Sequence, residues 1–223
     1  MEISNRSTQP IMTGPGEQDR PVYTTDGRFI LYLSDETINR IPDIGGPPEE
    51  VLSGFPFLNI ECLPGAASEC LAGHIDGKEY VFTSFDAVTG NAQELLRISH
   101  RAPFTKWDLS PDGSTLAVVH NDDDAVRLIS LSSGQEKILR VQDWTSFEFV
   151  SWAGDGQRLF LNAGFSIAGK LSDLISVDLQ GNASILRQAV SQWHVYPVTS
   201  PDGRYVAFSS MPFHGNAWLI TEF

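Results

Sequence analysis

The dipeptide Asp-Gly occurs five times in this chain, each time between a strand-like segment and a run of aromatic and β-branched residues. The copies begin at Asp26, Asp76, Asp112, Asp155 and Asp202. Their spacings of 50, 36, 43 and 47 residues bracket the roughly 40 to 45 residues of a four-stranded propeller blade. The recurrence predicts an all-β protein, a β-propeller of about five antiparallel four-stranded blades that closes fully or forms a partial ring.

Each Asp-Gly pair is expected to form a hairpin turn between the first and second strands of its blade. Glycine accepts a positive φ at little cost, and aspartate tolerates it and can accept hydrogen bonds from nearby backbone amides. The predicted structural turn residues are Asp26, Gly27, Asp76, Gly77, Asp112, Gly113, Asp155, Gly156, Asp202 and Gly203. Because turn chemistry accounts for these aspartates, we do not expect them to converge on a metal ion.

The strand pattern indicates one domain after a short N-terminal segment. Residues 1–20 form that segment, in which residues 9–13 are a candidate closing strand, and residues 21–223 form the propeller. The expected blades cover about 21–53, 57–101, 104–141, 147–189 and 193–223. The second has no clear outer strand, and the fifth ends after its third strand, over residues 216–220. The sequence therefore also allows two alternatives to a closed propeller, namely a partial ring and a fragment of a longer protein.

Charge and hydropathy limit the classes of partner. The chain has 15 Lys and Arg residues against 28 Asp and Glu residues, which gives a net charge of −13. Such a chain repels a phosphate backbone, so nucleic acid is not an expected partner. No apolar run approaches the roughly 18 residues of a membrane span, and the polar N-terminus does not resemble a secretory signal. We therefore expect no membrane insertion by this chain.

The two cysteines, Cys62 and Cys70, are separated by Leu-Pro-Gly-Ala-Ala-Ser-Glu. This number and spacing fit no zinc motif. Pro64-Gly65 can bend the chain between two strand-like pieces, which would allow a local disulfide. Two buried free thiols fit the sequence equally well, so both states stay open.

No local motif supplies a catalytic, cofactor-binding or metal site. Gly164-Phe-Ser-Ile-Ala-Gly169 departs from the nucleophile elbow because its second glycine is one position late and no helical pattern follows. The histidines have no spacing typical of metal ligands; they are His74, His100, His120, His194 and His214. Residues distant in sequence could still meet in a propeller channel, so a metal-dependent hydrolase or lactonase is an alternative function.

Several short sequence segments resemble TolB-like, WD-like propeller repeats. The clearest are Leu109-Ser-Pro-Asp-Gly113, Thr199-Ser-Pro-Asp-Gly203 and Ile41-Pro-Asp-Ile-Gly-Gly-Pro-Pro48, and the resemblance covers about residues 20–223. Val177-Asp-Leu-Gln-Gly-Asn182 and the terminal Trp218-Leu-Ile-Thr-Glu-Phe223 are similar to the C-terminal propeller of acidobacterial serine/threonine protein kinases and winged-helix regulators. That resemblance implies a sensing or interaction module, often attached beyond a membrane anchor.

The kinase machinery itself is missing from this sequence. His100-Arg101-Ala102 has alanine where the catalytic His-Arg-Asp motif needs aspartate. We expect a non-catalytic module, without a cofactor, that binds a protein or small ligand and derives from the sensory part of a bacterial signalling protein. It would be periplasmic if its parent is anchored in a membrane, and cytoplasmic otherwise.

Overall fold

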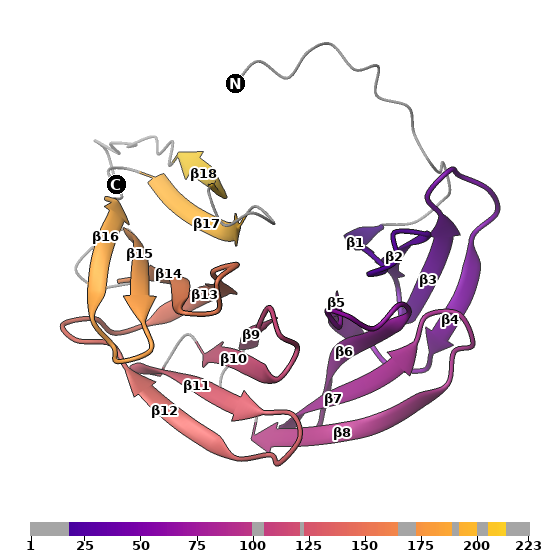
Figure 1. The fold of residues 1–223 in the computed structure, drawn as a ribbon, viewed down its shortest axis with the longest axis horizontal. Coiled ribbons are helices and arrows are strands. Elements are labelled where there is room, and N and C mark those ends of the chain that lie inside the picture. The colour runs from indigo at the N-terminus through magenta and orange to yellow at the C-terminus, as the bar shows by residue number, and fades with distance from the viewer. Residues whose placement is uncertain are drawn as a thin grey trace, which may run out of the picture. The chain divides into compact units, whose positions relative to one another are not determined.

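The computed structural model describes residues 18–99, 105–120, 123–164, 173–188, 192–199 and 205–212. These residues form eighteen β-strands (Figure 1). No helix within these ranges is long and apolar enough to cross a membrane. The chain divides into two compact units, Met1–His100 and Arg101–Phe223, and each is described by itself.

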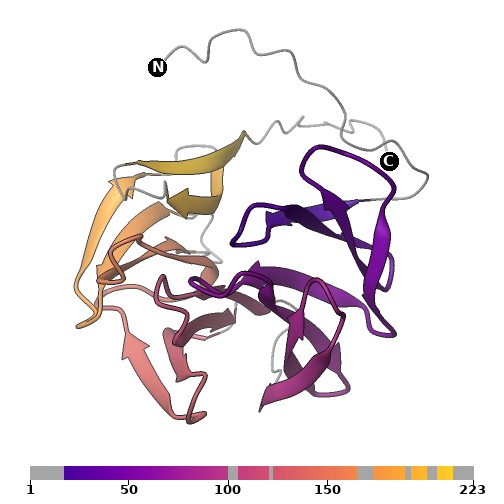
Figure 2. The same ribbon diagram turned by 45° about the vertical axis from the view of Figure 1, so that its right-hand side comes forward.

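The first unit contains two four-stranded antiparallel sheets, each with its strands in sequence order (Figures 1 and 2). The first blade consists of β1 (Asp19–Tyr23), β2 (Phe29–Ser34), β3 (Thr37–Pro42) and β4 (Glu49–Ser53). The second blade consists of β5 (Phe57–Cys62), β6 (Glu69–Asp76), β7 (Glu79–Asp86) and β8 (Ala92–Ser99).

The core of the first unit lies between these two sheets. Leu31, Leu33 and Ile38 of the first blade pack in one cluster with Phe57 and Phe85 of the second. The central strands β2 and β7 are buried along most of their length because both of their faces are covered, whereas the outer strand β8 is mostly exposed. Each fully buried side chain of this kind contributes about 1.5–3 kcal/mol.

The second unit contains two more four-stranded antiparallel sheets and a two-stranded one. The third blade consists of β9 (Thr105–Leu109), β10 (Thr115–His120), β11 (Ala125–Ser130) and β12 (Glu136–Arg140). The fourth consists of β13 (Phe147–Trp152), β14 (Arg158–Ala163), β15 (Asp173–Asp178) and β16 (Ala183–Arg187). One apolar cluster joins the two blades and includes Val126, Leu139, Phe147 and Leu161.

The expectation of about five blades is wrong for complete blades, since the described residues form four. In the fifth predicted blade the structure describes only the hairpin of β17 (Gln192–Thr199) and β18 (Val206–Pro212). The third strand expected over residues 216–220 lies outside the described residues, as does the closing strand expected over residues 9–13.

The second blade differs from its predicted layout in two ways. It does have an outer strand, β8, which pairs with β7 along its length. In addition, Asp76-Gly77 joins the second and third strands of this blade and not the first and second, because Asp76 pairs directly with Glu79 around a two-residue turn. Asp-Gly marks a tight turn, but it does not specify which strands the turn connects.

Candidate functional site

The first turns of the first, third and fourth blades share one backbone frame. In each, the residue that starts the turn donates its N–H to the carbonyl five residues on, and the glycine donates back to the starting carbonyl. The first pair of bonds is Thr24 N to Phe29 O (2.9 Å) and Gly27 N to Thr24 O (2.8 Å), and equivalent pairs start at Ser110 and Ala153. All three glycines have positive φ, at 71°, 72° and 66°, so these turns require the glycine for its backbone conformation.

The turn aspartates bind the backbone and hydroxyl groups of their own turns. Asp112 Oδ1 accepts from Ser110 Oγ (2.6 Å), Ser114 N (3.0 Å) and Ser114 Oγ (2.8 Å). Asp26 Oδ1 accepts from Thr24 Oγ1 (2.7 Å) and Arg28 N (3.1 Å). Because these bonds favour the charged carboxylate, the pKa values of Asp26 and Asp112 lie below their usual value.

The other predicted turn residues fall into different settings. Asp155 Oδ1 accepts a single backbone bond, from Gln157 N (2.9 Å). Asp76 Oδ2 accepts from an Arg97 Nη1 hydrogen (2.8 Å) and not from its turn. Asp202 and Gly203 lie outside the described residues. Each of the four described carboxylates therefore forms its hydrogen bonds within its own blade.

The first turn of the second blade has a similar backbone frame that is one residue longer, in which an alanine and not a glycine donates back to the starting carbonyl. Leu63 N donates to Glu69 O (2.9 Å) and Ala66 N donates to Leu63 O (3.2 Å). At the base of this turn Cys62 and Cys70 are register partners on β5 and β6, and a disulfide joins them. The disulfide thus closes the one first turn, among those described, that has no Asp-Gly pair.

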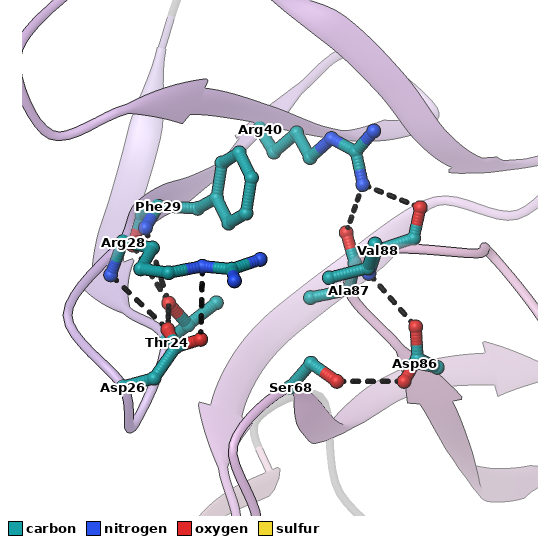
Figure 3. Close-up of polar contacts among 9 residues, drawn as sticks. All are labelled: Thr24, Asp26, Arg28, Phe29, Arg40, Ser68, Asp86, Ala87 and Val88. Carbon is teal, nitrogen blue, oxygen red and sulfur yellow. Dashed lines mark hydrogen bonds and ion pairs between the residues drawn. The ribbon is translucent and has the colours of Figure 1, made fainter.

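The first turns of the two blades of the first unit contact each other directly. Thr25 Oγ1 donates to Leu63 O (3.0 Å), and Asp26 N donates to Ala67 O (3.3 Å). Around them lies a set of polar contacts that we call the junction cluster, drawn in Figure 3. Its members are Thr24, Asp26, Arg28, Phe29, Arg40, Ser68, Asp86, Ala87 and Val88.

Arg40 of β3 is the cation at the centre of the junction cluster. Its Nη1 donates to Ala87 O (2.7 Å) and Val88 O (2.5 Å) of the second blade, while Nε and Nη2 donate to Glu49. The guanidinium also lies 5.0 Å from the centre of the Phe29 ring, and the Arg28 guanidinium lies 5.4 Å from the same centre (Figure 3). With its side chain only 18% exposed, Arg40 joins the two blades.

Asp86 holds the loop that Arg40 contacts. Its Oδ2 accepts from Ser68 Oγ (2.7 Å), and its Oδ1 accepts from Val88 N (2.9 Å) and Thr89 N (2.7 Å). The Ser68 bond, followed by these backbone bonds, lowers the pKa of Asp86 to about 2. Asp178 has the same role between β15 and β16, since its Oδ1 accepts from Gln180 N and Asn182 N, both at 2.9 Å.

The glycines of these two loops allow each loop to touch the outer strand of the preceding blade. A Cβ on Gly90 would lie 2.7 Å from Val51 O, and one on Gly181 would lie still closer to Arg140 O. Gly181 O also accepts a bond from Gln142 N (3.0 Å). The same device therefore links the first blade to the second, and the third to the fourth.

Two of the five histidines that were considered as metal ligands, His74 and His120, are buried in different surroundings. His74 packs against Phe55, with ring centres 4.2 Å apart, and against Phe57, and its Nδ1 has no hydrogen-bond partner. His120 Nδ1 lies 2.9 Å from Thr105 Oγ1, and its Nε2 lies 3.4 Å from Arg127 Nη1. Within the described ranges no group of three or more His, Cys, Asp or Glu side chains could hold a metal ion.

Among the remaining predicted positions, Gly164 donates its N–H to Ser146 O (3.2 Å). Gly164 is described, but residues 165–170 are not, and His100 and His214 also lie outside the described residues. The sequence reasoning missed Arg40, whose contacts are made across 47 residues of chain and leave no local pattern. Asp86 and Asp178 do leave a local pattern, because each ends a strand, β7 or β15, and precedes a glycine by three or four residues.

Comparison with known proteins identifies the type of fold to which these blades belong. No protein-family model matches the chain, and no curated protein matches it either. Among solved structures, a TolB protein of Agrobacterium tumefaciens aligns with a TM-score of 0.71 and 20% identity, over 91% of this chain and 73% of its own. The fold is a TolB-like β-propeller.

Other solved structures share this fold, and they include an enzyme. TolB of Acinetobacter baumannii has a TM-score of 0.68 and 17% identity, over 88% of this chain and 49% of its own. An oligogalacturonate lyase in complex with manganese has a TM-score of 0.62 and 14% identity, over 86% of this chain and 58% of its own. At such identities the likeness carries the architecture alone, because unrelated activities recur on one fold.

Proposed function

We propose that this chain is a non-catalytic propeller module that binds a protein or a small ligand. It would derive from the sensory C-terminal part of a bacterial signalling protein of the kinase type, as the resemblance of its repeat phrases suggests. The TolB-like fold supports a module of this kind, and the finer assignment rests on the sequence resemblance.

The use of the turn carboxylates is the observation that carries the proposal. Asp26, Asp86, Asp112 and Asp178 each accept hydrogen bonds from backbone N–H groups of their own turns, and each has a lowered pKa. These groups hold loops in place on a packed scaffold. Fixed loops on a rigid sheet framework are the usual place for recognition.

A small ligand has a candidate position beside the loop that Asp86 holds. A pocket of about 270 Å³ there is lined by Glu69, Ser84, Asp86, Asn91 and Gln93, among others. Ser84 Oγ donates to Glu69 Oε1 (3.1 Å), whereas the side chain of Gln93 is exposed on the outer strand β8. With two carboxylates and no cationic side chain, this lining best fits a polar ligand that donates hydrogen bonds.

The test is a binding screen of the purified chain against bacterial lysate proteins, peptides and metabolites, with a hydrolase panel run on the same sample. We expect at least one saturable partner and no turnover that survives repurification. A small polar hit is then measured against Gln93→Ala, which should weaken its binding. Turnover that persists through repurification, without any saturable partner, would contradict the proposal.

The high negative charge requires a control, since an acidic chain retains basic proteins through unspecific attraction. Attraction of that kind weakens as salt rises, and it does not need an intact fold. The control variant is Gly181→Val, which keeps the charge but places a side chain against Arg140 O. A specific partner should stay bound to the native chain in 0.3 M salt and be lost from the variant.

A further inference from the structure

We propose that the junction between the first two blades depends on oxidation, because the Cys62–Cys70 disulfide takes the place of the aspartate that fastens the other first turns. Each of the other three described first turns contains an Asp-Gly pair whose carboxylate bonds within the turn. Residues 63–68 of the second blade, Leu-Pro-Gly-Ala-Ala-Ser, have no carboxylate. The covalent bond between the strands at their base supplies the constraint in its place.

The turn held by the disulfide provides three of the backbone acceptors at the junction. Leu63 O accepts from Thr25 Oγ1 (3.0 Å) and Ala67 O accepts from Asp26 N (3.3 Å), both from the first blade. Ser68 O accepts from Ala87 N (2.7 Å), beside the carbonyls that Arg40 binds. If this turn becomes more mobile, its hydrogen bonds to the first turn of the first blade and to Ala87, beside the Arg40 contact, should weaken.

The two cysteine residues differ in exposure to solvent. Cys70 is fully buried in the core shared by the two blades, whereas Cys62 is half-buried and packs at the edge of that core. A thiolate from solvent therefore reaches Cys62 first. The arrangement makes one sulfur the point of attack and the other the leaving group.

Reduction by a dithiol then proceeds in two balanced exchanges. The reductant's thiolate attacks Cys62 Sγ, the bond to Cys70 breaks, and Cys70 leaves as a thiolate that takes up a proton. The second thiol of the reductant attacks the mixed disulfide, which releases Cys62 as a thiol and the reductant as a cyclic disulfide. Two electrons and two protons pass to the protein, and the strands lose their covalent link at the turn.

The first experiment measures amide hydrogen exchange of the whole chain before and after treatment with dithiothreitol. Opening the link restores conformational freedom to a closed loop of nine residues, so we expect exchange about ten to a hundred times faster at the junction. The amides of Asp26 and Ala87 report on it, and those of Ser110 and Gly113 in the third blade serve as internal controls that should not change. The proposal would be overturned if the Asp26 and Ala87 amides exchanged at the same rates before and after reduction. Two free thiols in the native unreduced protein would also overturn it.

The second experiment tests whether an aspartate can replace the disulfide. Cys62→Ala with Cys70→Ala should exchange like the reduced protein and should not respond to dithiothreitol. In that background residues 63–68 are replaced by the five residues Ser-Pro-Asp-Gly-Ser of the third blade, which should restore slow exchange at Asp26 and Ala87. Suppose that reduction accelerates hydrogen exchange at the junction while the transplanted Ser-Pro-Asp-Gly-Ser turn fails to slow it again. That result would refute the proposal that the disulfide takes the place of a turn aspartate. The first experiment uses the native sequence, so it decides the oxidation dependence even where the double variant fails to fold.

Discussion

Gly181 shows how a single missing side chain sets the distance between two blades. Its φ of 92° lies in the left-handed region, and its Cα faces the backbone carbonyl of Arg140. An alanine there would meet two obstacles, the cost of the backbone conformation and the collision of its Cβ with an oxygen atom that belongs to the main chain and cannot rotate away. The position thus requires glycine for two independent reasons.

We predict that Gly181→Ala lowers the free energy of unfolding by about 2 to 5 kcal/mol, as the sum of left-handed strain and overpacking. The matched control is Gly77→Ala, because Gly77 has a φ of 59° but no atom near the added Cβ. It should lose only the conformational part, about 1 to 2 kcal/mol. Urea denaturation of both variants measures the difference, and equal losses would show that the approach to Arg140 carries no cost.

The titration of a single side chain, the His74 imidazole, makes the free energy of unfolding depend on pH. Burial lowers its pKa below the usual 6.5, an effect that Arg97 reinforces and that the charges of Asp76 and Glu94 oppose. Below pH 6.5 the unfolded chain therefore binds more protons at this site than the folded chain does. The contribution of His74 is complete above pH 6.5 and is lost as the pH falls toward the lowered pKa.

We predict that His74→Phe removes this dependence, since phenylalanine fills the space between Phe55 and Phe57 without titrating. The native protein should lose stability relative to the variant between about pH 6.5 and 5, with a slope of at most about 1.4 kcal/mol per pH unit. Above pH 7 the two curves should run parallel, which serves as the control. Parallel curves across the whole range would contradict the assignment.

At the scale of elements, the first turns show what a short sequence signal can and cannot predict. In the structure, turns lie at the Asp-Gly pairs that begin at Asp26, Asp76, Asp112 and Asp155, and the chemistry of a tight turn is local. The connection made by Asp76-Gly77 was predicted wrongly because strand order depends on pairing over the whole blade. In the second blade the first turn carries Pro64-Gly65 and a disulfide, so the repeat has a different signal there.

We predict that Asp112→Ala destabilises the protein by about 1 to 2 kcal/mol, because it removes the acceptor of one backbone amide and two hydroxyl groups. Asp155→Ala, which removes a single backbone bond, should cost about 0.5 to 1 kcal/mol. Asp112→Asn keeps an acceptor oxygen and should fall between the native protein and Asp112→Ala. Thermal or urea unfolding at pH 7 gives the order, and a larger loss at Asp155 would contradict it.

The pH dependence of the Asp112 turn follows from the same bonds. Its pKa is lowered in the folded protein, so its contribution is present above the unfolded value near 3.8 and is lost as the pH falls below it. The difference between the native protein and Asp112→Ala should therefore shrink in acid. A difference that stays constant down to pH 2 would show that the carboxylate charge is not what holds the turn.

At the scale of the whole molecule, the repeat predicted the class of fold but not the number of complete blades. Alternating and buried strands of the right spacing are specified locally, so the all-β propeller fold could be read from the sequence. Contacts such as Arg40 with Ala87, or Gly181 with Arg140, depend on the packing of one blade on the next. They leave no periodic pattern, which is why the junction cluster emerged only from the structure.

The net charge of −13 makes a final prediction that belongs to the whole chain. A compact chain with 28 acidic and 15 basic residues repels itself more strongly when folded than when extended, and salt screens that repulsion. The ion pairs oppose this trend because salt weakens them too, but most involve exposed carboxylates, as in Arg97 with Asp76 and Arg140 with Asp124, and such pairs contribute at most about 1 kcal/mol each. We therefore expect the urea midpoint to rise between 0.05 and 0.5 M sodium chloride, with the slope of the transition unchanged. A midpoint that falls with added salt would mean that the ion pairs outweigh the excess of negative charge.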